Sequence, residues 1–128
     1  MISRKKPNSI QKDRKAHFKE FLEDVLKQVN AYVVQEPDTP LFKDILALFT
    51  QQKYGLIHSF RTRNESIQEY YEIFFDMFFD EWINQEFFEV QIALFFVLFI
   101  FIDTVPKVFQ VKVLVCQEKV KFLHLLIE

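Results

Sequence analysis

The histidines and the single cysteine are the first residues to consider for metal or nucleophilic chemistry in this 128-residue chain. His17, His58 and His124 lie far apart, and none has another histidine or a cysteine three or four residues further on. Because Cys116 is the only cysteine, no zinc site can be assembled at the common ligand spacings. We therefore expect no metal site.

Two further patterns could support catalysis, and both have simpler interpretations. Cys116 and His124 could act as nucleophile and base, but nothing orients such a pair, so a buried structural thiol is favoured. Paired carboxylates can do acid–base chemistry, yet these acids lie opposite an aromatic stripe, which indicates a solvated face. The acids are Glu65, Glu69, Glu72, Asp76 and Asp80. We expect no catalytic residue, no cofactor and no enzymatic activity.

Cationic side chains that could contact phosphate or carboxylate form two groups. Residues 1–19 carry seven Lys or Arg residues against one acid, and we expect residues 1–11 to be a basic, flexible arm. The second group is Lys53, Arg61 and Arg63, and arginine suits planar bidentate contacts. Contact with DNA or a partner subunit, or bridges from Arg61 and Arg63 to the chain's own acids, are equally compatible with the sequence.

Apolar periodicity predicts the first elements that position these groups. A helical stripe runs over residues 13–34, with charged residues on the opposite face. Thr39 followed by Pro40 predicts the start of a second helix, which ends near Lys53. Residues 54–64 are expected to form a short polar linker.

The strongest helical pattern follows Ser66, where Ser66-x-x-Glu69 predicts a capping box. Its apolar residues recur at steps of three and four. Seventeen phenylalanines in so small a chain indicate that some aromatic surface meets a partner, although a Phe-rich core is the simpler alternative. The candidate partner surface is Phe74, Phe75, Phe78, Phe79 and Trp82.

The region from Phe87 to Ile102 is apolar on nearly all sides and includes an uninterrupted apolar run, Ile92–Ile102. A membrane span needs about 20 apolar residues, so a central buried helix is favoured. Alternation over Val108–Val115 predicts an extended segment, and a last helix is expected over Gln117–Ile127. One glycine in the chain argues against a many-stranded fold and excludes Gly-rich phosphate loops.

The fold class expected from these patterns is all-α. A single domain over residues 12–128 would contain about five helices and one short extended segment near the C-terminus. Two membrane alternatives stay open: a peripheral helical adaptor with a basic arm, and a small integral membrane protein that uses Ile92–Ile102.

The segment Lys53–Asn64 resembles a family pattern, Lys-aromatic-Gly-x-Ile-x-x-x-Arg-x-Arg-Asn, and aligns with it without a gap. The family is subunit 1 of the small nuclear RNA-activating protein complex (SNAPc), in its N-terminal region. The resemblance covers about residues 18–128. It extends to Phe42–Phe49, Phe88–Leu98, Gln110–Val113 and Val120–Leu123. The chain departs from the family in its loop around Pro37, which is longer, and in its more acidic, Phe-rich helix after Ser66. It also stops before the family's longer polar tail, so functions of that tail are not transferred.

The resemblance implies a nuclear scaffold subunit of the complex that recognises promoters of small nuclear RNA genes, which RNA polymerases II and III transcribe. Its implied partners are a Myb-repeat subunit, a subunit with a zinc-binding module, TATA-binding protein and, through the complex, promoter DNA. No membrane and no small-molecule substrate are implied. Within the motif, Gly55 is predicted to allow a positive-φ turn or a close approach.

Overall fold

The computed structural model describes residues 7–36 and 38–107, and this part of the chain is helical without a strand. Its elements in chain order are α1 (Pro7–Gln35), α2 (Phe42–Gln51), the 3₁₀ helix η1 (Tyr54–Ser59), α3 (Ile67–Ile83) and α4 (Phe88–Asp103). The prediction of an all-α fold is confirmed. The segments expected over Val108–Val115 and Gln117–Ile127 lie outside the described residues.

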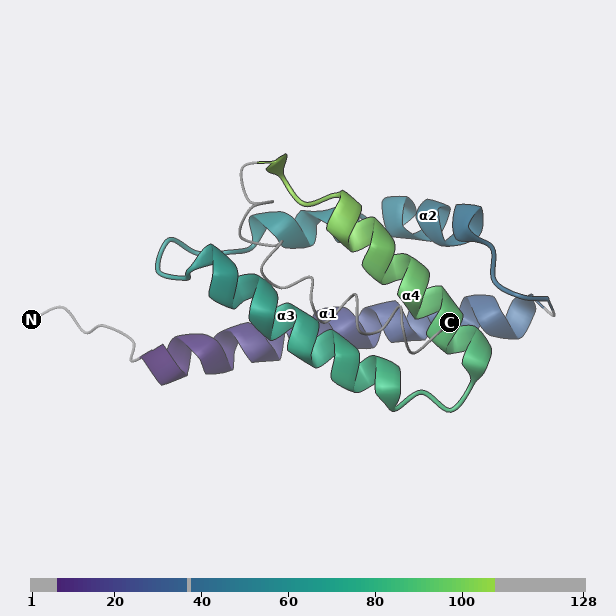
Figure 1. Ribbon diagram of the computed structural model, residues 1–128, viewed down its shortest axis with the longest axis horizontal. Coiled ribbons are helices and arrows are strands. Elements are labelled where there is room, and N and C mark those ends of the chain that lie inside the picture. Colours follow the sequence, from purple (N-terminus) through teal and green to yellow (C-terminus); the bar gives the residue numbers. More distant parts are fainter. Residues whose placement is uncertain (1–6, 37, 108–128) are drawn as a thin grey trace, which may run out of the picture.

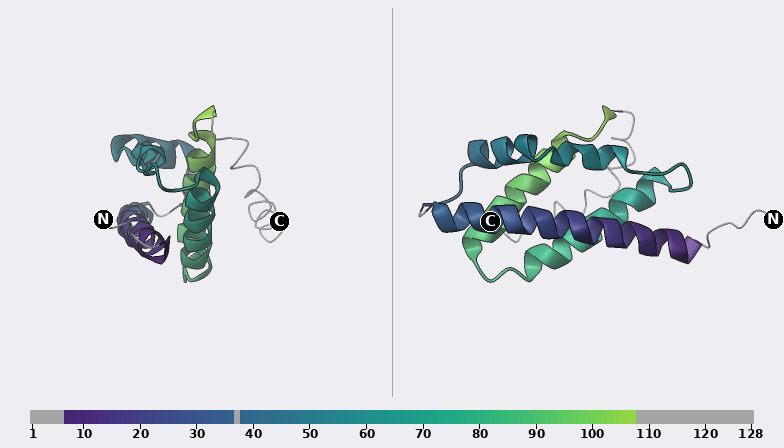
Figure 2. Two further views of the ribbon diagram at one scale, coloured as in Figure 1. Left: turned by 90° about the vertical axis from the view of Figure 1, so that its left-hand side faces the viewer. Right: turned by 180° about the vertical axis from the view of Figure 1, so that it is seen from behind.

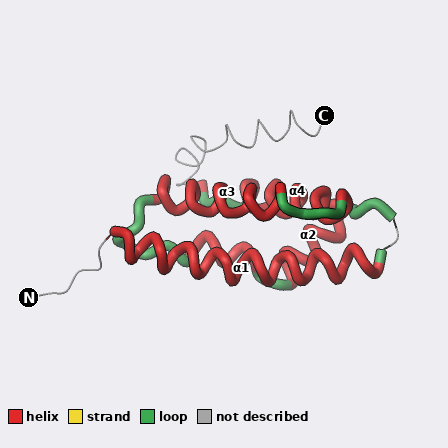
Figure 3. Tube along the Cα trace, turned by 90° about the horizontal axis from the view of Figure 1, so that it is seen from below, coloured by secondary structure: helices red, strands yellow, loops and turns green. Residues whose placement is uncertain are grey.

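The helices form two layers. The long helix α1 lies beside α2 and η1 in one layer, and α3 and α4 cross over them in the other (Figures 1 and 2). Helix α4 packs on both α1 and α2, whereas α3 packs mainly on α1. Seen from below, α3 and α4 lie on one side of α1 (Figure 3). One face of α4 is therefore buried between the layers, and its other face points outward.

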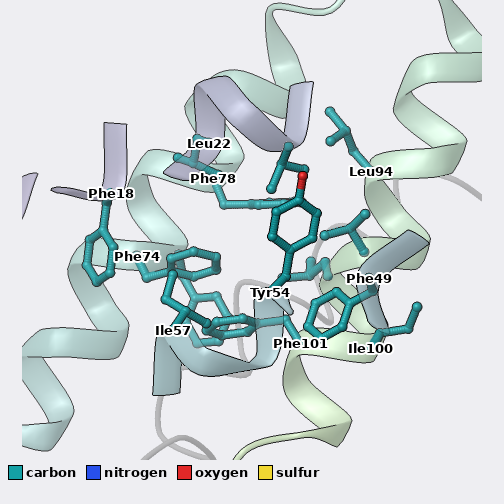
Figure 4. Packing of buried hydrophobic residues seen from close by; sticks show 14 of the residues in the cluster. Phe18, Leu22, Phe49, Tyr54, Ile57, Phe74, Phe78, Leu94, Ile100 and Phe101 are labelled. Atoms are coloured by element: carbon teal, nitrogen blue, oxygen red, sulfur yellow. The ribbon is translucent and has the colours of Figure 1, made fainter. Parts of the chain in front are cut away.

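Aromatic rings fill the space between the layers. Phe74 of α3 stacks on Phe101 of α4 with ring centroids 4.0 Å apart, and Phe18 of α1 meets Phe74 edge-on at 5.3 Å. Tyr54 and Ile57 enter the same core from η1 (Figure 4). Offset and edge-to-face ring pairs add about 0.5–1.5 kcal/mol each to the energy of burying their area. A Phe-rich core thus joins all five described helices.

Two predicted helix starts differ from the structure. Helix α1 begins at Pro7, so residues 7–11, expected in the arm, are helical. Proline is tolerated at the first helical position because no N–H is needed there. Helix α2 begins at Phe42 instead of Pro40, and its N-cap Leu41 makes no side-chain capping bond.

The third predicted start is confirmed. Ser66 is the N-cap of α3, and its hydroxyl accepts a hydrogen bond from the Glu69 N–H at 3.2 Å. The apolar run Ile92–Ile102 lies within α4, the predicted central helix. Within residues 7–36 and 38–107, no helix is long and apolar enough to cross a membrane.

Candidate interaction surface

The family-like segment Lys53–Asn64 contains the 3₁₀ helix η1. The sequence predicts a polar linker over residues 54–64, so this helix is a difference between prediction and structure. The turn that precedes η1 has its positive φ at Lys53, where φ is 56°, and Gly55 has none. A Cβ at Gly55 would lie 3.7 Å from Cε1 of Phe49, which is ordinary van der Waals contact. The positive-φ turn predicted at Gly55 is therefore wrong, because the left-handed residue before η1 is Lys53, two positions earlier.

One face of η1 points into the core and anchors the segment. The Tyr54 hydroxyl donates a hydrogen bond to Asp24 of α1 at 2.8 Å, and burial raises the pKa of Tyr54. The Ile57 carbonyl accepts a hydrogen bond from the hydroxyl of Tyr70 in α3. These bonds fasten the segment to both layers of the fold.

His58 completes this inward face. Its Nδ1 lies 2.9 Å from the Tyr71 hydroxyl, and its Nε2 lies 3.1 Å from the Phe101 carbonyl and 3.0 Å from the Thr104 hydroxyl. A carbonyl can only accept, so Nε2–H donates to Phe101 and Nδ1 accepts from Tyr71. Burial lowers the pKa of His58 to about 4, although its bond to the Phe101 carbonyl opposes this shift. The imidazole of His58 is therefore neutral in the folded chain near pH 7.

A buried ion pair joins the end of the segment to α1. Arg14 donates from Nε to Glu65 Oε2 at 2.8 Å and from Nη2 to Glu65 Oε1 at 2.6 Å, and both side chains are buried. The guanidinium also lies over the rings of Phe18 and Tyr70, 5.3 and 4.9 Å from their centroids. The prediction that Glu65 lies on a solvated face is therefore wrong, because its carboxylate is buried against Arg14.

The electrostatics of this pair favour its charged form. Burial by itself raises the pKa of Glu65, but hydrogen bonds from Arg14 and Thr62 outweigh burial and lower it. The hydrogen bond to Glu65 raises the pKa of Arg14. Sequence reasoning missed the pair because its partners are 51 positions apart, and each sits in a run of like charges. The one sequence signal that could have suggested a buried position is that Glu65 directly precedes Ser66, the N-cap of α3, and α3 packs on α1.

The three predicted cationic contacts separate in the structure. Arg61 is half-buried and donates from Nη1 to the backbone carbonyl of Glu65 at 2.7 Å, so it closes the loop before α3. Nη1 also donates to the Thr62 carbonyl at 3.3 Å. Lys53 and Arg63 are exposed. Arg63 is therefore better placed than Arg61 to meet an external carboxylate or phosphate.

The outward face of the segment combines exposed apolar side chains with a cavity. Leu56 and Phe60 are each 54 % exposed. A cavity of about 490 Å³ opens between α1 and the segment, and Phe60 lines it together with Phe21 and His17. Ile57, which is buried, also lines it. This outward face, comprising Leu56, Phe60, Arg63 and the cavity, is hereafter the motif surface.

The predicted aromatic partner surface on α3 lies inside the chain. Phe74, Phe75 and Phe78 are buried, and Phe79 is buried at the edge of the core. Their rings contact Phe18 of α1 in the other layer and Phe101 of the neighbouring helix α4, so the apolar side of α3 is covered by the chain itself. Only Trp82 is partly exposed, and its Nε1 donates to the Gln91 carbonyl at 3.0 Å.

Comparison of the chain with protein-family models, with curated proteins and with solved structures finds no match. Among residues 7–36 and 38–107, no group of three or more His, Cys, Asp or Glu side chains could hold a metal ion.

Proposed function

We propose that this chain is a non-catalytic scaffold subunit of a nuclear promoter-binding complex for small nuclear RNA genes. The proposal rests on the resemblance of Lys53–Asn64 to the SNAPc subunit 1 pattern. It is supported by the motif surface, where an exposed phenylalanine borders a cavity large enough to receive apolar side chains of a partner. In this proposal the partners are the Myb-repeat subunit, the zinc-module subunit and TATA-binding protein.

The observation that carries the proposal is that Lys53–Asn64 has one set of side chains buried in the core and another set exposed to solvent. Tyr54, Ile57 and His58 anchor the segment in the core through burial and hydrogen bonds, while Leu56, Phe60 and Arg63 are exposed. An anchored element that presents apolar and cationic side chains beside a cavity suits a protein interface, because less entropy is lost in ordering it on binding. Arginine and aromatic residues are enriched in such interfaces.

The experiment compares two matched variants of the full chain, each co-expressed with the Myb-repeat subunit. Phe60→Ser removes a ring from the motif surface, and Phe87→Ser removes a similarly exposed ring, 62 % exposed, between α3 and α4. We expect Phe60→Ser to weaken co-purification at least tenfold, since interface hot spots contribute about 2 kcal/mol or more. Phe87→Ser should bind as the wild type does.

Equal binding by both variants would contradict the proposed role of the motif surface. Failure of the wild-type chain to bind the Myb-repeat subunit would contradict the assignment to this complex. A vesicle flotation assay run in parallel distinguishes the peripheral membrane adaptor, which would float with lipid.

A further inference from the structure

Helix α4 is apolar on nearly all sides, and the other described helices bury mainly one of its faces. Its inward face lies against α1, α2 and α3 through buried residues such as Ala93, Leu94 and Val97. Its outward face carries Phe88, Ile92, Phe95 and Phe99 at steps of four, three and four residues. These four residues are hereafter the outer stripe of α4. A helix that is apolar on all sides is normally covered on all sides.

The outer stripe has shape as well as apolar character. Phe88 and Phe99, at its two ends, are 64 % and 54 % exposed. A groove of about 250 Å³ lies along its first half, lined by Trp82, Phe88, Ile92 and Phe96. Phe42 of α2 borders the other half, edge-on to Phe99 with ring centroids 6.0 Å apart.

We propose that the outer stripe of α4 is a docking site for the chain's own residues 108–128. These 21 residues follow Asp103, the end of α4, with only residues 104–107 between, and 13 of them are hydrophobic. Pro106 favours a change of direction at this point. A contact between residues 108–128 and the outer stripe would shield the apolar side chains of both from water.

Length and charge agree with this occupant. The stripe runs from Phe99 back to Phe88, about 16 Å at the helical rise, and a segment of 21 residues spans about 30 Å even if helical. Residues 64–103 contain nine Asp and Glu residues and no Lys or Arg. Lys112, Lys119 and Lys121 give residues 108–128 an excess of one positive charge. The inference goes beyond the proposed function, because it concerns a contact within the chain.

The sequence offers a direct test, since Cys116 is the only cysteine and lies in this segment. A second cysteine is placed on the stripe in the full chain as Phe88→Cys, Ile92→Cys or Phe99→Cys, one at a time. The matched control is Glu23→Cys, on the exposed side of α1 in the other layer. After mild oxidation, peptide mapping of the monomer fraction identifies disulfides to Cys116.

We expect at least one stripe position to form an intrachain disulfide on the order of tenfold faster than the control, because docking raises the effective concentration. Disulfides found only between two chains would show that a second copy covers the stripe and would overturn the proposal. Rates equal to the control at all three positions would also overturn it, and would leave the stripe to a foreign partner.

A second measurement avoids substitutions in α4. Trp82, the only tryptophan, lines the groove, so its fluorescence reports on what approaches it. A nitroxide attached to Cys116 of the otherwise unchanged chain should quench Trp82 several-fold more strongly than a diamagnetic analogue, and denaturant should abolish the difference. Equal fluorescence with both labels under native conditions would contradict docking.

Discussion

At the scale of single residues, the buried pair Arg14–Glu65 is the contact that sequence analysis could least foresee. Arg14 belongs to the basic stretch near the N-terminus, and Glu65 begins the acidic run, so each was expected to face solvent. Both side chains are instead buried at the edge of the core. The backbone N–H and the hydroxyl of Thr62 also donate hydrogen bonds to Glu65, each at 3.1 Å. The Glu65 carboxylate thus accepts from both Arg14 and Thr62, and these hydrogen bonds oppose the cost of its desolvation.

Removing one member of this pair should destabilise the chain strongly. We expect Glu65→Ala to lower the free energy of unfolding by about 3–5 kcal/mol, because it leaves the Arg14 charge buried and unpaired. The double variant Arg14→Met with Glu65→Leu should be close to the wild type. Urea melts of the full chain measure both, with Glu69→Ala, an exposed acid of α3, as control. A single variant no less stable than the control would show that the pair is not structural.

His58 should make stability depend on pH. Its folded pKa of about 4 lies below the unfolded value of about 6.5, so the unfolded chain binds a proton that the folded chain does not. Stability is therefore full above pH 6.5 and falls as the pH drops from 6.5 to about 4, by up to about 3 kcal/mol. His58→Asn, which cannot titrate, should lose much less stability between pH 7 and pH 5. Equal losses in thermal melts of the two proteins would contradict this assignment.

At the scale of elements, the helices with regular apolar stripes could be predicted from the sequence. The 3₁₀ helix η1 could not, because its conformation depends on contacts with residues far away in the chain. The stripe of α1, with Phe18, Leu22, Val25 and Val29, is buried as its spacing indicated. Helix η1 is too short to show a period, and its conformation depends on what Tyr54 and its neighbours contact in α1, α3 and α4. The same limit explains why the α3 rings were assigned to a partner: periodicity finds an apolar face but does not say what covers it.

The helix caps give a paired prediction. Ser66→Ala should lower the free energy of unfolding by about 1 kcal/mol, because the Glu69 N–H loses its acceptor. Thr39→Ala should have no measurable effect, since α2 starts after Leu41 and Thr39 caps nothing. Chemical denaturation of both variants measures the difference. An equal loss in the two would mean that the start of α2 has been misassigned.

The core positions of α3 and α4 can be tested by charge. Phe75 and Leu94 are 0 % and 2 % exposed, so Phe75→Asp and Leu94→Asp each bury an unpaired carboxylate at a cost of several kcal/mol. That is a large part of a total stability of about 5–15 kcal/mol. Glu72→Gln, on the polar side of α3, should melt as the wild type does. Circular dichroism melts in which the Asp variants match Glu72→Gln would refute the core assignment.

At the scale of the whole molecule, charge distribution argues against sequence reading of DNA by this chain alone. Nine acids and no Lys or Arg lie within residues 64–103, and the net charge is −2. Arg61 already bonds the Glu65 carbonyl, which leaves Arg63 and Lys53 as the exposed cations of the motif. Phosphate contacts from these two would position the chain without reading bases.

We therefore expect the isolated chain to bind matched and mismatched promoter elements equally weakly. In an assembled complex, Arg63→Ala should weaken both DNAs alike and lower the salt slope by about one if it contacts a phosphate. Binding titrations at several salt concentrations measure both effects. Selective loss on the matched element would instead indicate base readout by Arg63.

The proposed role as a promoter-complex scaffold is tested most directly by affinity purification of the tagged full chain from its own cells. The co-purifying proteins are identified by mass spectrometry and compared with those of the Phe60→Ser and Phe87→Ser variants. The account predicts a Myb-repeat protein, a zinc-module subunit and TATA-binding protein with the wild type and with Phe87→Ser, and their loss with Phe60→Ser. Recovery of membrane proteins or of no stable partner by the wild-type chain would contradict it.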